Sequence, residues 1–264
     1  MLLLLRACHP GPTVAVTLLA ALVAAGVGHS AAPLVLVVLA VFAGQLSIGW
    51  SNDLLDADRD RQVHRADKPI ASGDLSTRAV GVALALALAA CVLFSLLSGL
   101  WAGLVHLVLV VGSGWAYNAR LKSTAWSWLP YAVAFGSLPA VVTLALDPPV
   151  PPAPWMMLVG ALLGVGAHLV NVLPDLDDDA ATGVRGLPHR LGRSTTQTLA
   201  TILLSVASVV VVVGADGPPP AWAWVALASV VALAAVGMRG RGRISFHAAV
   251  AIALIDVVMF TIRA

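Results

Sequence analysis

Charged residues are scarce in this sequence, and one acidic residue type is missing. Only 11% of the 264 residues are charged, there is no glutamate, and aspartate accounts for all 13 acidic side chains. Soluble domains carry roughly 25% charged residues, whereas this chain is 59% hydrophobic and has a mean hydropathy of +0.94. These values exclude an ordinary soluble enzyme. We expect a multi-pass protein of the cell membrane, surrounded by the lipid bilayer, with no nucleic acid among its partners.

Cysteine is almost absent as well. Cys8 and Cys91 are the only two and lie in different segments, which excludes a disulfide framework or a zinc knuckle. The first ten residues, "MLLLLRACHP", have no basic region ahead of their leucines, and no small-residue cleavage site precedes the first apolar run. We therefore expect the first helix to be retained and not removed as a signal peptide.

Apolar runs recur along the chain, each long enough to cross a bilayer as a helix, which takes about 20 residues. The runs are uniformly apolar, which excludes the alternating pattern of a membrane β-barrel and favours α-helices. Because no segment resembles a linker, we predict that residues 1–264 form one all-α integral-membrane domain of nine spans. The predicted spans lie near residues 12–28, 32–50, 77–97, 100–118, 126–146, 155–173, 195–213, 220–237 and 244–262.

The predicted loops differ sharply in basic residues between the two sides of the membrane. Residues 51–76, "ARLK", "VRGLPHRLGR" and "RGRGR" lie on one side, whereas "GHSAAP", "DPPVPPAP" and "GADGPPP" on the other side contain no Lys or Arg. Loops rich in Lys and Arg remain in the cytoplasm. The basic side, which also holds the acidic motifs described next, is therefore predicted to face the cytoplasm.

Two acidic motifs, "NDLLDADRD" and "NVLPDLDDD", share one skeleton. In each, an asparagine and two aspartates follow one another at intervals of four residues: Asn52, Asp56 and Asp60, then Asn171, Asp175 and Asp179. A basic segment with Pro and Gly follows each motif, "DKPIASG" in the first case and "GVRGLPHRLG" in the second. The offset corresponds to four spans, so we predict two parallel four-helix repeats plus a last helix, with both motifs at one membrane face.

The spacing within each motif indicates a metal site. Steps of four residues turn a helix by about 40° each, so the three side chains spread over roughly 80° of one face. Carboxylates gathered in a poor dielectric need a cation between them. Oxygen ligands without Cys or His favour Mg²⁺, which prefers one or two carboxylates together with phosphate oxygens. Two matched motifs weigh against the other interpretation, solvated acids at helix ends, and predict a diphosphate ligand.

Basic and polar residues beside the motifs would suit that diphosphate. Arginine binds phosphate oxygens bidentately, and lysine acts as a point charge. Each basic residue also has an alternative interpretation as a charge that only sets the topology. The candidates for substrate binding are Arg65, Lys68, Tyr117, Lys122, Asn171 and Arg185, and those for catalysis are Asp56, Asp60, Asp175 and Asp179.

Taken together, "NDLLDADRD" with "DKPIASG", "YNARLK", and "NVLPDLDDD" with "GVRGLPHRLG" resemble the UbiA superfamily of intramembrane prenyltransferases. The resemblance implies nine helices in one bundle around a central cavity, two Mg²⁺ ions and a polyprenyl diphosphate donor. It implies metal ligation or its close support by Asn52, Asp56, Asp60, Asp175 and Asp179. The chain departs from the family where Lys68 replaces a common arginine and where Lys122 follows Tyr117 at an interval of five positions, which is one shorter in some members.

The implied reaction is Mg²⁺-dependent transfer of the prenyl group to an acceptor, aromatic or another lipid-pathway nucleophile, inside the membrane. A divalent-cation or proton-coupled transporter with repeated acidic sites is the alternative, and a scaffold subunit with a decayed site is a third. Acids along several spans would favour the transporter, but only Asp256 lies within a span. The sequence leaves open the acceptor, the prenyl length, the oligomeric state and the roles of His106, His168 and Asp256.

Overall fold

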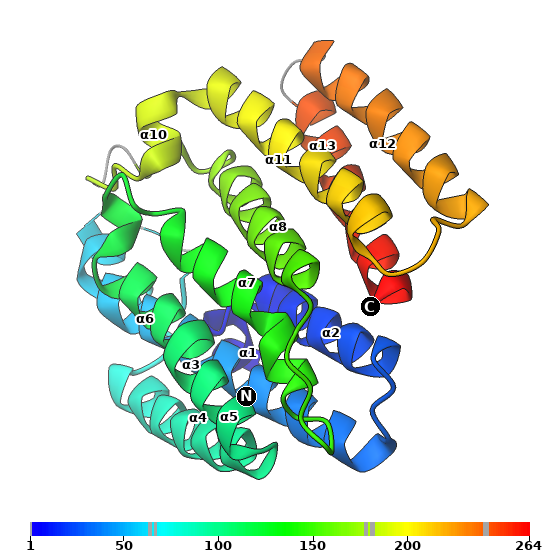
Figure 1. Ribbon diagram of the computed structural model, residues 1–264. Coiled ribbons are helices and arrows are strands. Elements are labelled where there is room, and N and C mark those ends of the chain that lie inside the picture. Colours follow the sequence, from blue (N-terminus) through cyan, green and yellow to red (C-terminus); the bar gives the residue numbers. More distant parts are fainter. Residues whose placement is uncertain (1, 63–64, 66–67, 177–178, 180–182, 240–242) are drawn as a thin grey trace. The chain divides into compact units, whose positions relative to one another are not determined.

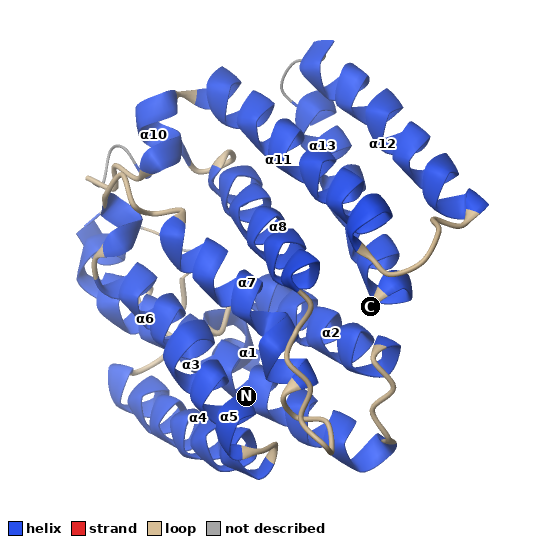
Figure 2. Ribbon diagram, in the orientation of Figure 1, coloured by secondary structure: helices blue, strands red, loops and turns tan. Residues whose placement is uncertain are grey.

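The computed structural model describes residues 2–62, 65, 68–176, 179, 183–239 and 243–264. Regular structure in these ranges is helical throughout, and no strand occurs in them (Figure 2). The prediction of an all-α protein is confirmed.

Most of the predicted spans coincide with helices that are long and apolar enough to cross a membrane. Among the described residues there are seven such helical segments. They are α3 (Ala31–Gln62), α4 (Thr77–Leu97), the segment Leu100–Ala119, α8 (Pro154–Val172), α11 (Arg193–Gly214), α12 (Ala221–Arg239) and α13 (Arg243–Arg263). Two shorter apolar helices, α2 (Pro10–Gly26) and α7 (Leu129–Thr143), fall within or close to the two remaining predicted ranges. The count of nine spans stays a prediction.

The chain forms two compact units. The first comprises Met1–Arg120 and Ala140–Pro151, and the second comprises Leu121–Pro139 and Pro152–Ala264. In the first unit α3 is the central helix and packs against α2 and α4. In the second unit α11 packs against α8, α12 and α13, and the four helices run beside one another in Figure 1.

Helix α3 is much longer than the predicted span at residues 32–50, because it continues through the first acidic motif to Gln62. Two ion pairs at i,i+3 spacing, Arg59 with Asp56 and Arg61 with Asp58, support this polar extension. The motif therefore lies on a continuous helix that is anchored by its apolar half.

The span Leu100–Ala119 is interrupted by a π-helix, η1 (His106–Val111), between α5 (Leu100–Val105) and α6 (Gly112–Ala119). Single π-turns of this kind often mark sites where a polar or functional side chain is placed inside a helix. His106 is buried here, and its Nδ1 lies 2.7 Å from Ser95 Oγ on α4. The role that the sequence left open for His106 is thus a hydrogen bond to the neighbouring helix.

Candidate active site

The first acidic motif presents two buried carboxylates one helical turn apart. Asp56 is 8% exposed and Asp60 is 6% exposed, and both lie on α3 with Asn52. Arg59 Nη2 forms an ion pair with Asp56 Oδ2 at 2.9 Å. Because desolvated carboxylates need compensating positive charge, this end of α3 has the character of a cation site.

Asn52 is held in place by a residue that the sequence analysis did not single out. Asn52 Nδ2 donates a hydrogen bond to Asn118 Oδ1 at 3.2 Å. Asn118 is buried, and its own Nδ2 donates to Ile48 O at 2.8 Å and to Ser51 Oγ at 3.0 Å. Since the amide nitrogen of Asn52 donates to Asn118, its Oδ1 is the atom left to coordinate a cation. The signal in the sequence was the polar "YN" pair at the end of an apolar span.

Lys68, predicted to bind substrate, forms an ion pair with Asp53. Its Nζ lies 2.5 Å from Asp53 Oδ1 and 3.0 Å from His9 Nε2. Asp53 is 2% exposed and belongs to the same helix as the first motif. Neither Asp53 nor His9 was assigned a role from the sequence. Arg65, another predicted substrate-binding residue, donates its backbone N–H to Asp60 O at 3.0 Å, just beyond the end of α3.

The second acidic motif is built differently from the first, because α8 ends at Val172. Asn171 lies in the last turn of α8, and Asp175 follows in a turn where its N–H bonds to Val172 O at 3.2 Å. Pro174 has no N–H to donate to a carbonyl of the preceding turn, which accounts for the break even though Leu173 itself keeps helical backbone angles. The expectation of one continuous helical face holds for the first motif and is wrong for the second.

After the break, a hydrogen bond of the helical type reappears at Asp179, the third residue of the second motif. Asp179 N–H bonds to Asp175 O at 2.8 Å, which keeps these two residues one turn apart. Asn171 and Asp175 are exposed, and Asp179 is partly exposed. Asp177 and Asp178 lie outside the described residues. The second motif therefore presents its candidate ligands at a surface of its unit.

His189 is the nearest described imidazole to this motif. It lies in α10 (Leu187–Leu191), with Nε2 3.7 Å from Asp179 Oδ2. Burial lowers the pKa of His189, and the nearby Asp179 carboxylate opposes that shift. The imidazole and this carboxylate thus lie within ion-pair distance of each other.

The second unit brings two predicted substrate-binding segments together. A Cβ built on Gly186 would lie 2.7 Å from Lys122 O and 2.9 Å from Ser127 Oγ, so only glycine permits this approach. Leu187 N–H donates to Ser127 Oγ at 2.9 Å, which fastens the contact. The segment that holds the exposed Arg185 is thereby docked against η2 (Leu121–Ser123), which carries Lys122. Tyr117, at the end of α6, belongs to the first unit.

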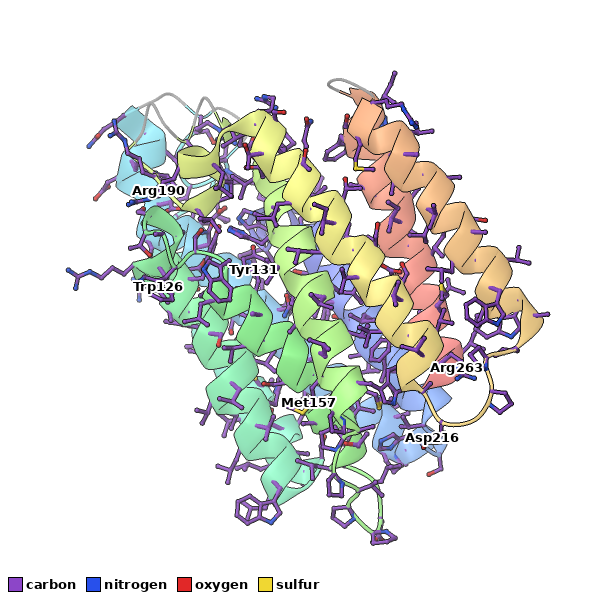
Figure 3. All side chains as sticks on the ribbon, turned by 45° about the horizontal axis from the view of Figure 1, so that its top comes forward. Trp126, Tyr131, Met157, Arg190, Asp216 and Arg263 are labelled. Atoms are coloured by element: carbon purple, nitrogen blue, oxygen red, sulfur yellow. The ribbon has the colours of Figure 1, made fainter. Side chains whose placement is uncertain are left out.

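His168 extends this docking network to α8. Its Nε2 lies 3.1 Å from Ser127 Oγ, and its ring stacks on Tyr131 of α7 with centroids 4.6 Å apart. Figure 3 shows Trp126, Tyr131 and Arg190 toward one end of this unit, with Asp216 and Arg263 at the other. His168 is 1% exposed, so its position is that of a buried support for the docked loops.

Asp256, the acid inside the last predicted span, has its partner on α11. Its Oδ1 accepts a hydrogen bond from Ser208, and the residue is fully buried. Intramembrane acids are costly and need such partners. This contact joins α13 to α11 and lies apart from either acidic motif in sequence.

The donor sets fit Mg²⁺ that is shared with a ligand. Within the described part of the chain, no three His, Cys or Asp side chains come close enough to form a closed metal cage. Mg²⁺ rarely uses such cages and prefers one or two carboxylates together with phosphate oxygens. The buried Asp56 and Asp60 pair, with the oriented oxygen of Asn52, matches that preference.

Comparison with known proteins gives a consistent picture. Residues 13–258 match the sequence profile of the UbiA prenyltransferase family. The 33 kDa chain of bacteriochlorophyll synthase from Cereibacter sphaeroides is 33% identical over 192 residues, which cover 68% of this chain and 62% of that protein. The digeranylgeranylglyceryl phosphate synthase of Methanopyrus kandleri is 30% identical over 70% of this chain and 65% of its own length. The matches thus span less than two thirds of these relatives.

Solved structures agree at the level of the fold. A UbiA homologue from Archaeoglobus fulgidus bound to GPP and Mg²⁺ superposes with a TM-score of 0.72 at 16% identity, covering 99% of this chain and 100% of that one. The apo structure of a UbiA homologue from Aeropyrum pernix K1 gives a TM-score of 0.72 at 20% identity, covering 91% and 95%. The expected similarity of fold is confirmed.

Proposed function

This chain belongs to the UbiA prenyltransferase family, and from that premise we propose that it transfers a prenyl group from a polyprenyl diphosphate to an acceptor within the membrane, in a Mg²⁺-dependent reaction. The observation that carries the proposal is the pair of buried carboxylates, Asp56 and Asp60, on one helix with an oriented asparagine. Such a pair suits a divalent ion that also binds phosphate oxygens.

The proposal assigns the metal to the two acidic motifs. Asn52, Asp56 and Asp60 of the first unit would hold Mg²⁺, as would Asp175 and Asp179 of the second unit. When bound, Mg²⁺ supplies positive charge that neutralises the departing diphosphate. Among relatives, the Archaeoglobus fulgidus homologue was solved with GPP and Mg²⁺, which supports the choice of ligand class.

Basic and polar side chains would bind the diphosphate and stabilise its growing charge as the allylic C–O bond breaks. Preorganised charge of this kind is usually the largest contribution to catalysis. The residues proposed for this task are Arg65, Lys68, Tyr117, Lys122, Asn171 and Arg185. Apolar walls exclude water, which would otherwise trap the allylic carbon as an alcohol. The acceptor nucleophile then bonds to that carbon and releases a proton.

The acceptor is proposed only as a class, an aromatic or other lipid-pathway nucleophile. The names of the relatives differ in this respect, since they include a bacteriochlorophyll synthase, a 4-hydroxybenzoate octaprenyltransferase and a digeranylgeranylglyceryl phosphate synthase. Nothing in the two acidic motifs distinguishes these acceptors.

The proposal includes an architecture. Residues 1–264 would act as one membrane domain of nine spans around a central cavity, built from two parallel four-helix repeats and a last helix. Both acidic motifs would face the cytoplasm. The basic character of the loops at residues 51–76 and 183–194 supports this orientation.

The test is incubation of the purified protein with labelled prenyl diphosphates and a membrane extract, followed by mass identification of the product. We expect a prenylated compound that forms only with Mg²⁺. The transporter alternative is examined by calorimetric titration of Mg²⁺ with and without a non-hydrolysable prenyl diphosphate. Tight Mg²⁺ binding that is indifferent to the diphosphate would favour the transporter and contradict the proposal.

A further inference from the structure

The N-terminal corner between α1 (Leu2–Ala7) and α2 is fastened directly to the acidic helix α3. A Cβ built on Gly49 would lie 2.2 Å from Cys8 O, so the corner touches the backbone of α3 where only glycine fits. Trp50 Nε1 donates to Leu4 O at 3.0 Å from the same stretch of α3. These contacts fix the position of the residue that follows Cys8.

That residue, His9, has an unusual backbone and a specific side-chain contact. Its φ of 56° is in the left-handed region, which non-glycine residues seldom adopt unless the surroundings impose it. Its Nε2 lies 2.9 Å from Asp53 Oδ1 and 3.0 Å from Lys68 Nζ. Residues of α3, of the following loop and of the N-terminal corner thus meet in one triad, consisting of His9, Asp53 and Lys68.

The geometry of the triad determines how the Lys68 ammonium is oriented. An ammonium has three N–H donors and no acceptor. Asp53 Oδ1 accepts one of them at 2.5 Å. His9 Nε2 lies 3.0 Å from Nζ and 2.9 Å from Asp53 Oδ1: with the ring proton on Nδ1 it accepts a second N–H of Lys68, and with the proton on Nε2 it donates to Asp53 and holds that acceptor in place. In either tautomer the His9–Asp53 pair holds the ammonium from one side, which leaves an N–H for a ligand on the other side. Lys68 is 17% exposed, Asp53 is 2% exposed and His9 is 37% exposed, so the Lys68–Asp53 pair is largely shielded from water and His9 lies partly at the surface.

We propose that His9 and Asp53 are positioning residues, which hold the Lys68 ammonium so that its third N–H is directed at the diphosphate of the prenyl donor. The inference rests on the proposed function and adds to it two residues, His9 and Asp53, that lie outside the two sets of candidate metal ligands. Asp53 anchors the ammonium, and His9 restricts the movement of this ion pair. Preorganisation of this kind increases affinity because little entropy is lost when the ligand binds.

The test is direct binding of non-hydrolysable geranyl thiodiphosphate to the full-length protein in detergent with Mg²⁺, measured by isothermal titration. His9→Phe keeps a ring but removes the acceptor nitrogen, and should weaken binding about tenfold, the equivalent of one lost hydrogen bond to a charged group. His9→Gln restores a side-chain acceptor and should recover most of the affinity. Lys68→Ala should weaken binding at least as much as His9→Phe.

Two further variants separate positioning from general support of the fold. Ser98→Ala removes a side-chain hydrogen bond to Phe94 O and touches neither the N-terminal corner nor the triad, so its affinity should equal that of the wild type. In a Lys68→Ala background, His9→Phe should cause no additional loss, because His9 acts through Lys68. Thermal unfolding in detergent, followed for every variant, reports any change in stability separately.

The outcomes are distinct. Failure of the wild-type protein to bind the thiodiphosphate would contradict the proposed function itself. Normal binding by wild type together with normal binding by His9→Phe would overturn the positioning inference alone. An equal loss in Ser98→Ala, a failure of His9→Gln to recover affinity, or additive losses in the double variant would overturn it as well.

Discussion

Asn52 donates its side-chain amide to Asn118 at 3.2 Å, across 66 residues of sequence, and this bond orients the first residue of an acidic motif. Asn118 is itself fixed by Ile48 O and Ser51 Oγ on α3. Residues that hydrogen-bond to a metal ligand determine which of its atoms faces the metal. The end of the fourth predicted span thereby becomes part of the first candidate metal site.

Replacing Asn118 should weaken the binding of Mg²⁺ without removing any candidate ligand. Because supporting hydrogen bonds to metal ligands are typically worth about 10- to 100-fold in metal affinity or activity, Asn118→Ala should raise the Mg²⁺ concentration for half-maximal prenyl transfer by about that factor. Ser51→Ala, which removes one of the two bonds that fix Asn118, should have a smaller effect. An unchanged Mg²⁺ requirement in Asn118→Ala would show that the bond is only structural.

The docking of the Arg185 segment onto the Lys122 segment depends on Ser127. Ser127→Ala leaves the Leu187 N–H without its acceptor and should lower the free energy of unfolding by about 1 to 3 kcal/mol. The KM for the prenyl diphosphate should rise, because two predicted substrate-binding segments lose their alignment. Ser123→Ala is the matched control, since Ser123 is exposed in the same region. Equal behaviour of the two variants would contradict this account.

Replacing either of two helical glycines by alanine should change the stability of the protein, in opposite directions for the two positions. A Cβ on Gly160 of α8 would lie 2.3 Å from the backbone oxygen of Phe135, whereas one on Gly81 of α4 meets nothing within 4 Å. Gly160→Ala should therefore destabilise the protein by about 1 to 3 kcal/mol through overpacking. Gly81→Ala should stabilise it by about 0.5 to 1 kcal/mol through helix propensity. Thermal unfolding in detergent measures both, and the same sign for both would be a contradiction.

The topology can be tested with single introduced cysteines. Cys8 and Cys91 are buried, so they should give little background labelling. Pro151→Cys and Pro218→Cys, both at exposed positions, should react with a membrane-impermeant maleimide in intact cells. Ser72→Cys, exposed beside the first motif, should react only after permeabilisation. Labelling of Ser72→Cys from outside would reverse the proposed orientation.

The elements of the fold could be predicted from sequence because their signals are local. Uniform apolar runs locate helices, and the four-residue spacing of Asn52, Asp56 and Asp60 requires only that α3 continue past Trp50. The break after Val172 was also encoded locally, by Pro174, but the parallel with the first motif led to the expectation of a helix there.

The supporting residues could not be predicted because their contacts join distant segments. His9 and Lys68 are 59 residues apart, and Ser127 and Leu187 are 60 apart. Neither pair has a spacing pattern, and each depends on close packing that glycine permits, at Gly49 in one case and Gly186 in the other. A single buried polar residue in an apolar chain indicates that a partner exists without indicating which.

The central claim is tested most directly by the rate of prenyl transfer in three single variants, assayed with labelled prenyl diphosphate and membrane extract. Asp56→Ala and Asp175→Ala should abolish product formation while the protein still inserts and folds, as should chelation of Mg²⁺ in the wild type. Asp58→Ala removes an acid from the same helix whose side chain is 91% exposed, and should retain full activity. Substantial transfer by Asp56→Ala or Asp175→Ala, or by the wild type in excess chelator, would contradict the account.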